Sequence, residues 1–153
     1  MAVKFRNMKR IGIFALLLFS LALAACHKEA PALQDYLEGE WKMESYYGTS
    51  ASEGAVQAEV YVKFAGGEFE LFQKIGGGHF SRRSGTYTRT GDSVSGIYSG
   101  GKAWSGDYSL AFSDNGNSLT MTQFTDGEEY SCLYLRTTIP ASVRKDAEDF
   151  SAS

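Results

Sequence analysis

Apolar and polar residues alternate along most of the chain between Trp41 and Arg136. Neighbouring side chains of a β-strand point to opposite faces, so this period of two predicts half-buried strands. In one such run polar residues separate Val56, Ala58, Val60, Val62 and Phe64. The pattern predicts eight strands, at about residues 41–47, 56–65, 68–75, 79–89, 93–99, 103–113, 117–124 and 128–136.

The segments between these strands are mostly short and contain glycine, as in Thr90-Gly91-Asp92 and Asp126-Gly127. Such turns join antiparallel neighbours, so the strands should form a meander. An open meander leaves two exposed edges, and closure into a barrel removes them. We therefore predict an all-β, eight-stranded antiparallel up-and-down barrel. The alternative is a two-sheet sandwich, which usually needs long crossover connections, and none is visible.

The pattern changes after Arg136. Pro140 suits a first helical turn, and Val143, Ala147 and Phe150 then follow at helical spacing among charged residues. This predicts a short C-terminal amphipathic helix, beginning at about residue 139 and packed on the barrel wall.

The N-terminal residues predict export. A basic tip precedes the apolar run Ile11–Ala25, which is short for a membrane span and typical of a signal peptide. Leu23-Ala24-Ala25-Cys26 resembles the lipobox of bacterial lipoproteins, which implies that Cys26 becomes the first mature residue and carries acyl chains such as palmitate. An ordinary signal peptide with an incidental cysteine is the alternative. The expected organisation is a signal peptide at 1–25, a lipidated tether at 26–36 and the barrel with its helix at 37–153.

The anchor predicts a place in the cell envelope. Lipoproteins retained in the inner membrane carry an aspartate at the second mature position, whereas His27 follows Cys26 here. This favours the outer membrane and leaves open on which side of that membrane the protein lies.

Removing four basic residues with the signal peptide changes the formal net charge from −3 to −7, which argues against nucleic-acid binding. Arg82-Arg83 is interpreted as part of a solvated strand edge. With Cys26 acylated, Cys132 has no partner and is expected to be a buried, inert thiol.

Glycine recurs two residues before an aromatic residue, for example in Gly85-x-Tyr87, Gly96-x-Tyr98 and Gly106-x-Tyr108. The two positions share one strand face, and the space above a glycine can receive a neighbouring ring. The candidate ligand-binding residues are Phe69, Tyr87, Tyr98, Trp104, Tyr108 and Phe112. Two interpretations remain open: these side chains line a pocket, or they fill the barrel completely.

Gly39-Glu40-Trp41 at the head of the first strand resembles the G-x-W motif of lipocalins, and Arg136 stands where that family stacks an arginine on the motif's tryptophan. The strand count and terminal helix also fit, although the family's T-D-Y motif is absent from its usual setting. The chain also resembles small lipocalin-like lipoproteins of Gram-negative bacteria. The resemblance implies a lipocalin-like barrel that binds a small hydrophobic or aromatic ligand.

The sequence offers no argument for an enzyme. His27 and His79 lie in no metal-ligand or catalytic spacing, and no nucleophile elbow or phosphate-binding loop is present, so no catalytic residue, metal or cofactor is expected. A competing hypothesis is an envelope interaction or inhibitor module with a solid core and no small-molecule ligand. Its anchors would be exposed aromatic residues, namely Tyr46, Tyr47, Tyr61 and Phe72.

Overall fold

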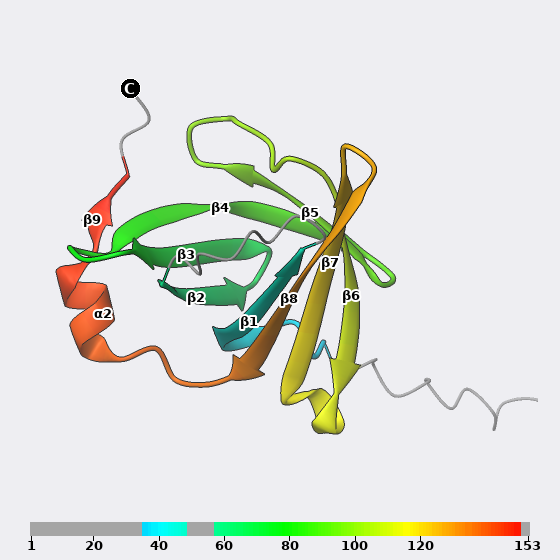
Figure 1. Ribbon diagram of the computed structural model, residues 1–153, viewed down its shortest axis with the longest axis horizontal. Helices are drawn as coiled ribbons and strands as arrows, with labels where there is room; N and C mark the ends of the chain where they lie inside the picture. Colours follow the sequence, from blue (N-terminus) through cyan, green and yellow to red (C-terminus); the bar gives the residue numbers. More distant parts are fainter. Residues whose placement is uncertain (1–34, 49–56, 151–153) are drawn as a thin grey trace, which may run out of the picture. The chain divides into compact units, whose positions relative to one another are not determined.

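The computed structural model describes residues 35–48 and 57–150, and these form a β-barrel with one short helix (Figure 1). The elements are β1 (Gly39–Gly48), β2 (Ala58–Ala65), β3 (Glu68–Ile75), β4 (Ser81–Thr90), β5 (Ser93–Tyr98), β6 (Tyr108–Ser113), the 3-10 turn η1 (Asp114–Gly116), β7 (Ser118–Thr125), β8 (Glu128–Arg136), α2 (Ala141–Asp146) and β9 (Glu148–Asp149). The predicted signal peptide and Cys26 lie outside the described residues. No helix among those described is long and apolar enough to cross a membrane.

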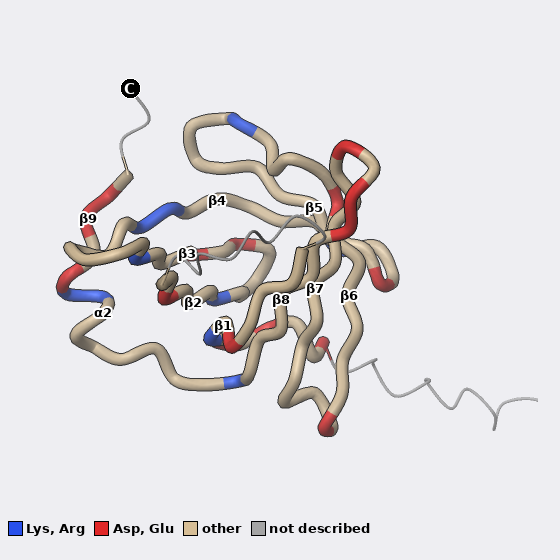
Figure 2. The backbone as a smooth tube through the Cα atoms, in the orientation of Figure 1, with Lys and Arg blue, Asp and Glu red and all other residues tan. Residues whose placement is uncertain are grey.

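The sheet closes on itself. Each of the eight main strands pairs antiparallel with the next, and β8 returns to β1 with Trp41 opposite Arg136. The prediction of an eight-stranded antiparallel barrel is confirmed, and the sandwich alternative is wrong, because closure leaves no separate second sheet. The β7–β8 turn carries acidic residues, seen in Figure 2, and its Asp126 and Gly127 both have positive φ (55° and 82°), as a tight hairpin turn requires.

The sixth strand is shorter than predicted. The alternation suggested a strand from residue 103, but β6 begins at Tyr108 and pairs with β5 only at Ser93↔Ser109 and Val94↔Tyr108. One isolated bridge, Ile97↔Ala103, is all that continues the pairing. The indole of Trp104 occupies the space above Gly96, where a Cβ would collide with it. Trp104 N–H still donates to the Gly96 carbonyl at 2.9 Å, so the regular pairing is interrupted only between Trp104 and Tyr108.

The C-terminal helix is also shorter than predicted. Helix α2 ends at Asp146, and the chain then runs extended as β9, parallel to the start of β4. Glu148 N–H donates to the Phe80 carbonyl and Phe150 N–H to the Arg82 carbonyl, both at 2.9 Å. These sheet hydrogen bonds replace the helical ones, so Val143 is buried while Phe150 is 53% exposed.

Two apolar clusters hold the molecule together. The larger fills one end of the barrel and includes the fully buried side chains Leu37, Trp41 and Leu119. The smaller lies outside the barrel wall, where α2 and the segment before it cover β2 and β3 with Ile139 and Val143. The helix therefore packs on the outer face and leaves the barrel interior to the strands.

Candidate functional site

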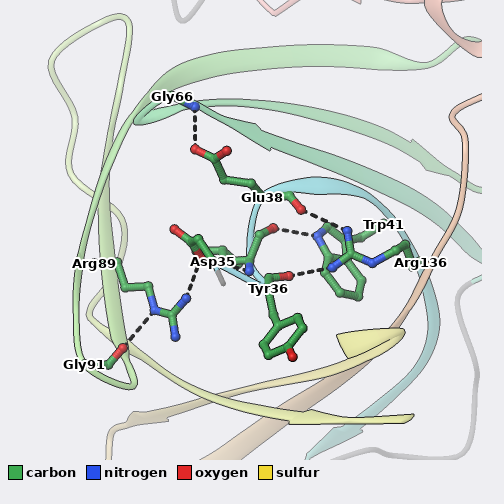
Figure 3. Close-up of polar contacts among 9 residues, drawn as sticks. Asp35, Tyr36, Glu38, Trp41, Gly66, Arg89, Gly91 and Arg136 are labelled. Carbon is green, nitrogen blue, oxygen red and sulfur yellow. Dashed lines mark hydrogen bonds and ion pairs between the residues drawn. The ribbon is translucent and has the colours of Figure 1, made fainter. Parts of the chain in front are cut away.

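One end of the barrel is closed by Arg136, which ends β8 (Figure 3). Its guanidinium lies over the Trp41 indole, 4.2 Å from the ring centre, as the sequence predicts. It also donates hydrogen bonds to the carbonyls of Tyr36 (2.6 Å) and Glu38 (2.9 Å), drawn in Figure 3, and to the carbonyl of Gly116 (2.9 Å). A side chain at Gly39, whose φ is +135°, would collide with this guanidinium. The Gly-x-Trp motif therefore seals this end with satisfied polar groups.

A second set of contacts fixes the same end. Arg89 of β4 pairs with Asp35, which precedes β1, and donates from Nε to the Gly91 carbonyl at 2.8 Å. Its guanidinium also lies 5.3 Å from the centre of the Phe112 ring. The Glu38 carboxylate accepts a hydrogen bond from Gly66 N–H at 2.9 Å. These contacts tie the segment before β1 across the end of the barrel.

Two of the six candidate ligand residues belong to this closed end. Tyr87 packs edge-on against Phe64 at 5.1 Å between ring centres, and Phe112 lies 6.4 Å from Trp41. Both rings pack against the buried cluster. For Tyr87 and Phe112 the filled-core interpretation holds, and the structure places neither on the cavity described next.

The other half of the barrel is hollow. A cavity of about 970 Å³ extends from the cluster toward the end where β2 begins and β1 ends. The remaining four candidates line it: Phe69, Tyr98, Trp104 and Tyr108. Its volume lies within the range of small-molecule pockets. Of the two interpretations, the structure favours a pocket here.

Three edge-to-face ring contacts build one wall of this cavity. Ring centres are 5.1 Å apart for Phe69 and Trp104, 5.7 Å for Trp104 and Tyr108, and 5.6 Å for Phe69 and Tyr98. Such T-shaped pairs add to the stability that burial gives each ring. Gly96 leaves the space in which Trp104 lies.

Sequence reasoning missed most of the opposite wall. β1, β2, β3, β7 and β8 supply further lining residues, among them Met43, Val60, Val62, Leu71, Met121, Cys132 and Tyr134. The signal was the same alternation that predicted the strands, because these residues occupy inward positions of their strands toward this end. The search for aromatic residues near glycines passed over the aliphatic positions.

A few polar groups interrupt the apolar lining. Ser105 in the lining hydrogen-bonds to the buried Gln123, which does not itself line the cavity, while the buried Ser45 Oγ in the lining has no hydrogen-bond partner among the described residues. Burial raises the pKa of the Tyr108 and Tyr134 hydroxyls, so both stay protonated and able to donate at neutral pH. The cavity thus offers a small number of neutral hydrogen-bonding groups.

Nucleophilic or metal chemistry finds no support in this arrangement. Burial raises the pKa of the Cys132 thiol, which keeps it protonated and poorly nucleophilic at neutral pH. The described residues contain no group of three or more His, Cys, Asp and Glu that could hold a metal ion.

The interaction-module hypothesis predicts four exposed aromatic residues, and the structure exposes two of them. Tyr46 and Tyr47 are 52% and 63% exposed, but Tyr61 and Phe72 are 5% and 1% exposed. The prediction is wrong for the last two because α2 covers them on the outer wall. Burial and a hydrogen bond to Glu59 raise the pKa of Tyr61 to about 12.

Two comparisons with known proteins found a similarity. The family model described as a lipocalin-like domain matches residues 37–121, more than half of the chain. The chain therefore belongs to the lipocalin-like family. The solved structure of apocrustacyanin C2 is similar at 14% sequence identity, covering 76% of this chain and 70% of that one, with a TM-score of 0.44. No curated protein sequence matches.

Proposed function

We propose that this lipocalin-like protein binds a small hydrophobic or aromatic ligand in its barrel cavity while a lipid on Cys26 holds it in the cell envelope. The observation that carries the binding proposal is the cavity of about 970 Å³. A barrel of eight strands either fills with its own side chains or holds one small ligand, and this one is filled at the closed end only.

The lining defines the class of ligand. It consists mainly of aliphatic and aromatic side chains, and Glu44 is the one residue with a formal charge among those described. Ligand pockets of this kind gain affinity from apolar contact and orientation from a few polar groups. Ser45 Oγ and the two buried tyrosine hydroxyls are placed to bond one or two polar atoms of the ligand.

The binding proposal is tested by titrating the purified chain with the apolar fluorescent probe N-phenyl-1-naphthylamine. Leu71 lines the cavity, so Leu71→Trp fills space that the probe would use. Losing room for about two methylene groups, at ~0.8 kcal/mol each, should weaken binding about tenfold. Leu135→Trp is the matched control, because Leu135 is 41% exposed and does not line the cavity. No probe binding, or equal effects of both variants, would contradict cavity binding.

The anchor proposal rests on the Leu-Ala-Ala-Cys motif and needs its own test. Cells expressing the chain are labelled with radioactive palmitate and separated into membrane and soluble fractions. The wild-type protein should carry label and sediment with membranes, whereas Cys26→Ala should lose the label. Cys132→Ala is the control and should keep it. Label that persists in Cys26→Ala would refute lipidation at this residue.

A further inference from the structure

Arg83 lies on the inner face of the barrel sheet. It pairs with Leu71 in the β3–β4 ladder, and Leu71 lines the cavity. Residues paired directly across antiparallel strands project from the same face. The interpretation of Arg82-Arg83 as a solvated edge is therefore wrong for Arg83. β5 ends at Tyr98, opposite Gly85, so Arg83 lies just past the end of that strand, where β9 lies beside β4.

The Arg83 guanidinium contacts aromatic rings but no acid. Its central carbon is 4.0 Å from the centre of the Phe150 ring and 5.7 Å from that of Tyr98. Within the described part of the chain no hydrogen bond or ion pair engages it, and its Nε is buried without a partner. The neighbouring Arg82 differs, because its Nε donates to Asp149 at 2.7 Å. A buried donor left without an acceptor costs free energy that a ligand could recover.

Arg83 borders a pocket of about 670 Å³ that lies between β4, the β5–β6 loop and the C-terminal segment. The loop is fixed in place, since Ser99 N–H donates to the Ser84 carbonyl and Tyr98 N–H to the Lys102 carbonyl, both at 2.8 Å. Lys102 also lines the pocket. Figure 2 shows basic residues on β4 and on this loop. Asp149, the acid in the lining, is already paired with Arg82.

We propose that this pocket binds an oxyanion, a carboxylate or a phosphate group, through Arg83 and Lys102. The rings hold the guanidinium in place while leaving its N–H donors without an acceptor, and an oxyanion accepts from such a planar donor set in a bidentate manner. Lys102 adds a second positive charge. The whole chain has a formal net charge of −3, so it has more acidic than basic residues. The two unpaired cations of this pocket therefore run against the overall charge of the protein.

The oxyanion has two sources. It is either a small free anion or the head group of a ligand whose apolar part occupies the cavity. Tyr98 lines both the outer pocket and the cavity, so the two spaces are neighbours at this residue. The head-group version rests on the proposed function, whereas binding of a free anion does not.

The experiment compares octanoate with octan-1-ol, which share one chain and differ in the charged head, by calorimetric titration of the purified chain. Inorganic phosphate is a third arm, followed through the Arg83 Nε–H signal in nitrogen-15 NMR spectra. Octanoate should bind about tenfold more tightly than octan-1-ol, as expected for a charge-assisted hydrogen-bonded contact. Arg83→Gln should abolish that difference and leave octan-1-ol binding unchanged. Lys145→Gln removes the same charge from an exposed position on α2 and should change neither ligand.

The outcomes separate the hypotheses. A preference for octanoate that Arg83→Gln abolishes supports the head-group source, and a phosphate-induced shift of the Arg83 signal without that preference supports a free-anion site. Equal binding of octanoate and octan-1-ol with no shift by phosphate overturns the oxyanion proposal and leaves cavity binding standing. Failure of octan-1-ol and the naphthylamine probe to bind counts against the proposed function alone. Lys102→Gln changes a loop residue, so it repeats the test if Arg83→Gln does not fold.

Discussion

Replacing Arg136 by alanine should remove a large part of the stability of the barrel. The change deletes three hydrogen bonds from a charged donor to the carbonyls of Tyr36, Glu38 and Gly116, and the stacking on Trp41. At ~1 kcal/mol for each hydrogen bond, with ~0.5–2 kcal/mol for the cation–π contact, we expect a loss of about 4 kcal/mol. The free energy of unfolding of a native domain is about 5–15 kcal/mol in total, so a loss of this size is easily measured.

The assay is urea unfolding followed by far-ultraviolet circular dichroism at neutral pH. Arg136→Lys keeps a cation near Trp41 but cannot reach three carbonyls at once, so it should lose about half as much. Arg82→Ala is the control, since its ion pair with the 73% exposed Asp149 side chain should contribute less than about 1 kcal/mol. A loss below 1 kcal/mol for Arg136→Ala, or full stability of Arg136→Lys, would refute the reasoning.

Three further predictions concern the remaining packing. Gly96→Ala places a methyl group in the space of the Trp104 indole; we expect ~1–3 kcal/mol of destabilisation in urea and an altered near-ultraviolet circular dichroism signal. Phe72 is 1% exposed and lies beneath α2, so Phe72→Ala leaves a cavity there and should lower the free energy of unfolding by ~3–5 kcal/mol in the same assay. The hydrogen bond to Asp146 raises the pKa of His79, so this contact stabilises below the ordinary pKa of about 6.5 and is lost as pH rises through the folded value. His79→Gln should therefore destabilise at about pH 5.5 and much less at pH 8.5, and equal effects at both would contradict this account.

The barrel was predictable from sequence because its determinants are local. Alternation of side chains sets the strands, and turns such as Asp126-Gly127 set the antiparallel order. Closure then follows, because an open meander would expose two edges. The Trp41–Arg136 contact was expected from the resemblance to the lipocalin G-x-W motif, and closure of the sheet places the two residues opposite each other.

The departures from prediction come from contacts between segments distant in sequence. Residues 103–107 alternate like a strand, but the pairing with β5 ends at Trp104, whose N–H donates to the Gly96 carbonyl at 2.9 Å while its ring packs over Gly96, and it resumes only at Tyr108. Similarly, Ala147 and Phe150 have helical spacing with Val143, yet β4 offers free backbone groups that end the helix at Asp146. Local pattern alone cannot weigh such long-range partners.

The candidate site was half predictable for the same reason. Aromatic residues near glycines identify inward positions, but they do not tell which end of the barrel is filled. Tyr87 and Phe112 pack against side chains brought from β1 and β2, whereas Tyr98 and Tyr108 have open space beside them. Arg83 escaped notice because its inward direction depends on the register with Leu71, which a basic doublet in the sequence does not reveal.

Unsatisfied polar groups distinguish the two ends of this barrel. At the closed end each guanidinium nitrogen of Arg136 donates to a carbonyl, and the Trp41 indole N–H donates to the Leu37 carbonyl at 2.9 Å. Within the described residues, the two buried side-chain atoms without a partner are Ser45 Oγ, on the cavity, and Arg83 Nε, beside it. Folding alone would favour pairing or removing such groups, because each lowers stability. Their placement on one side of the molecule is what a barrel needs if one end maintains the fold and the other receives a ligand.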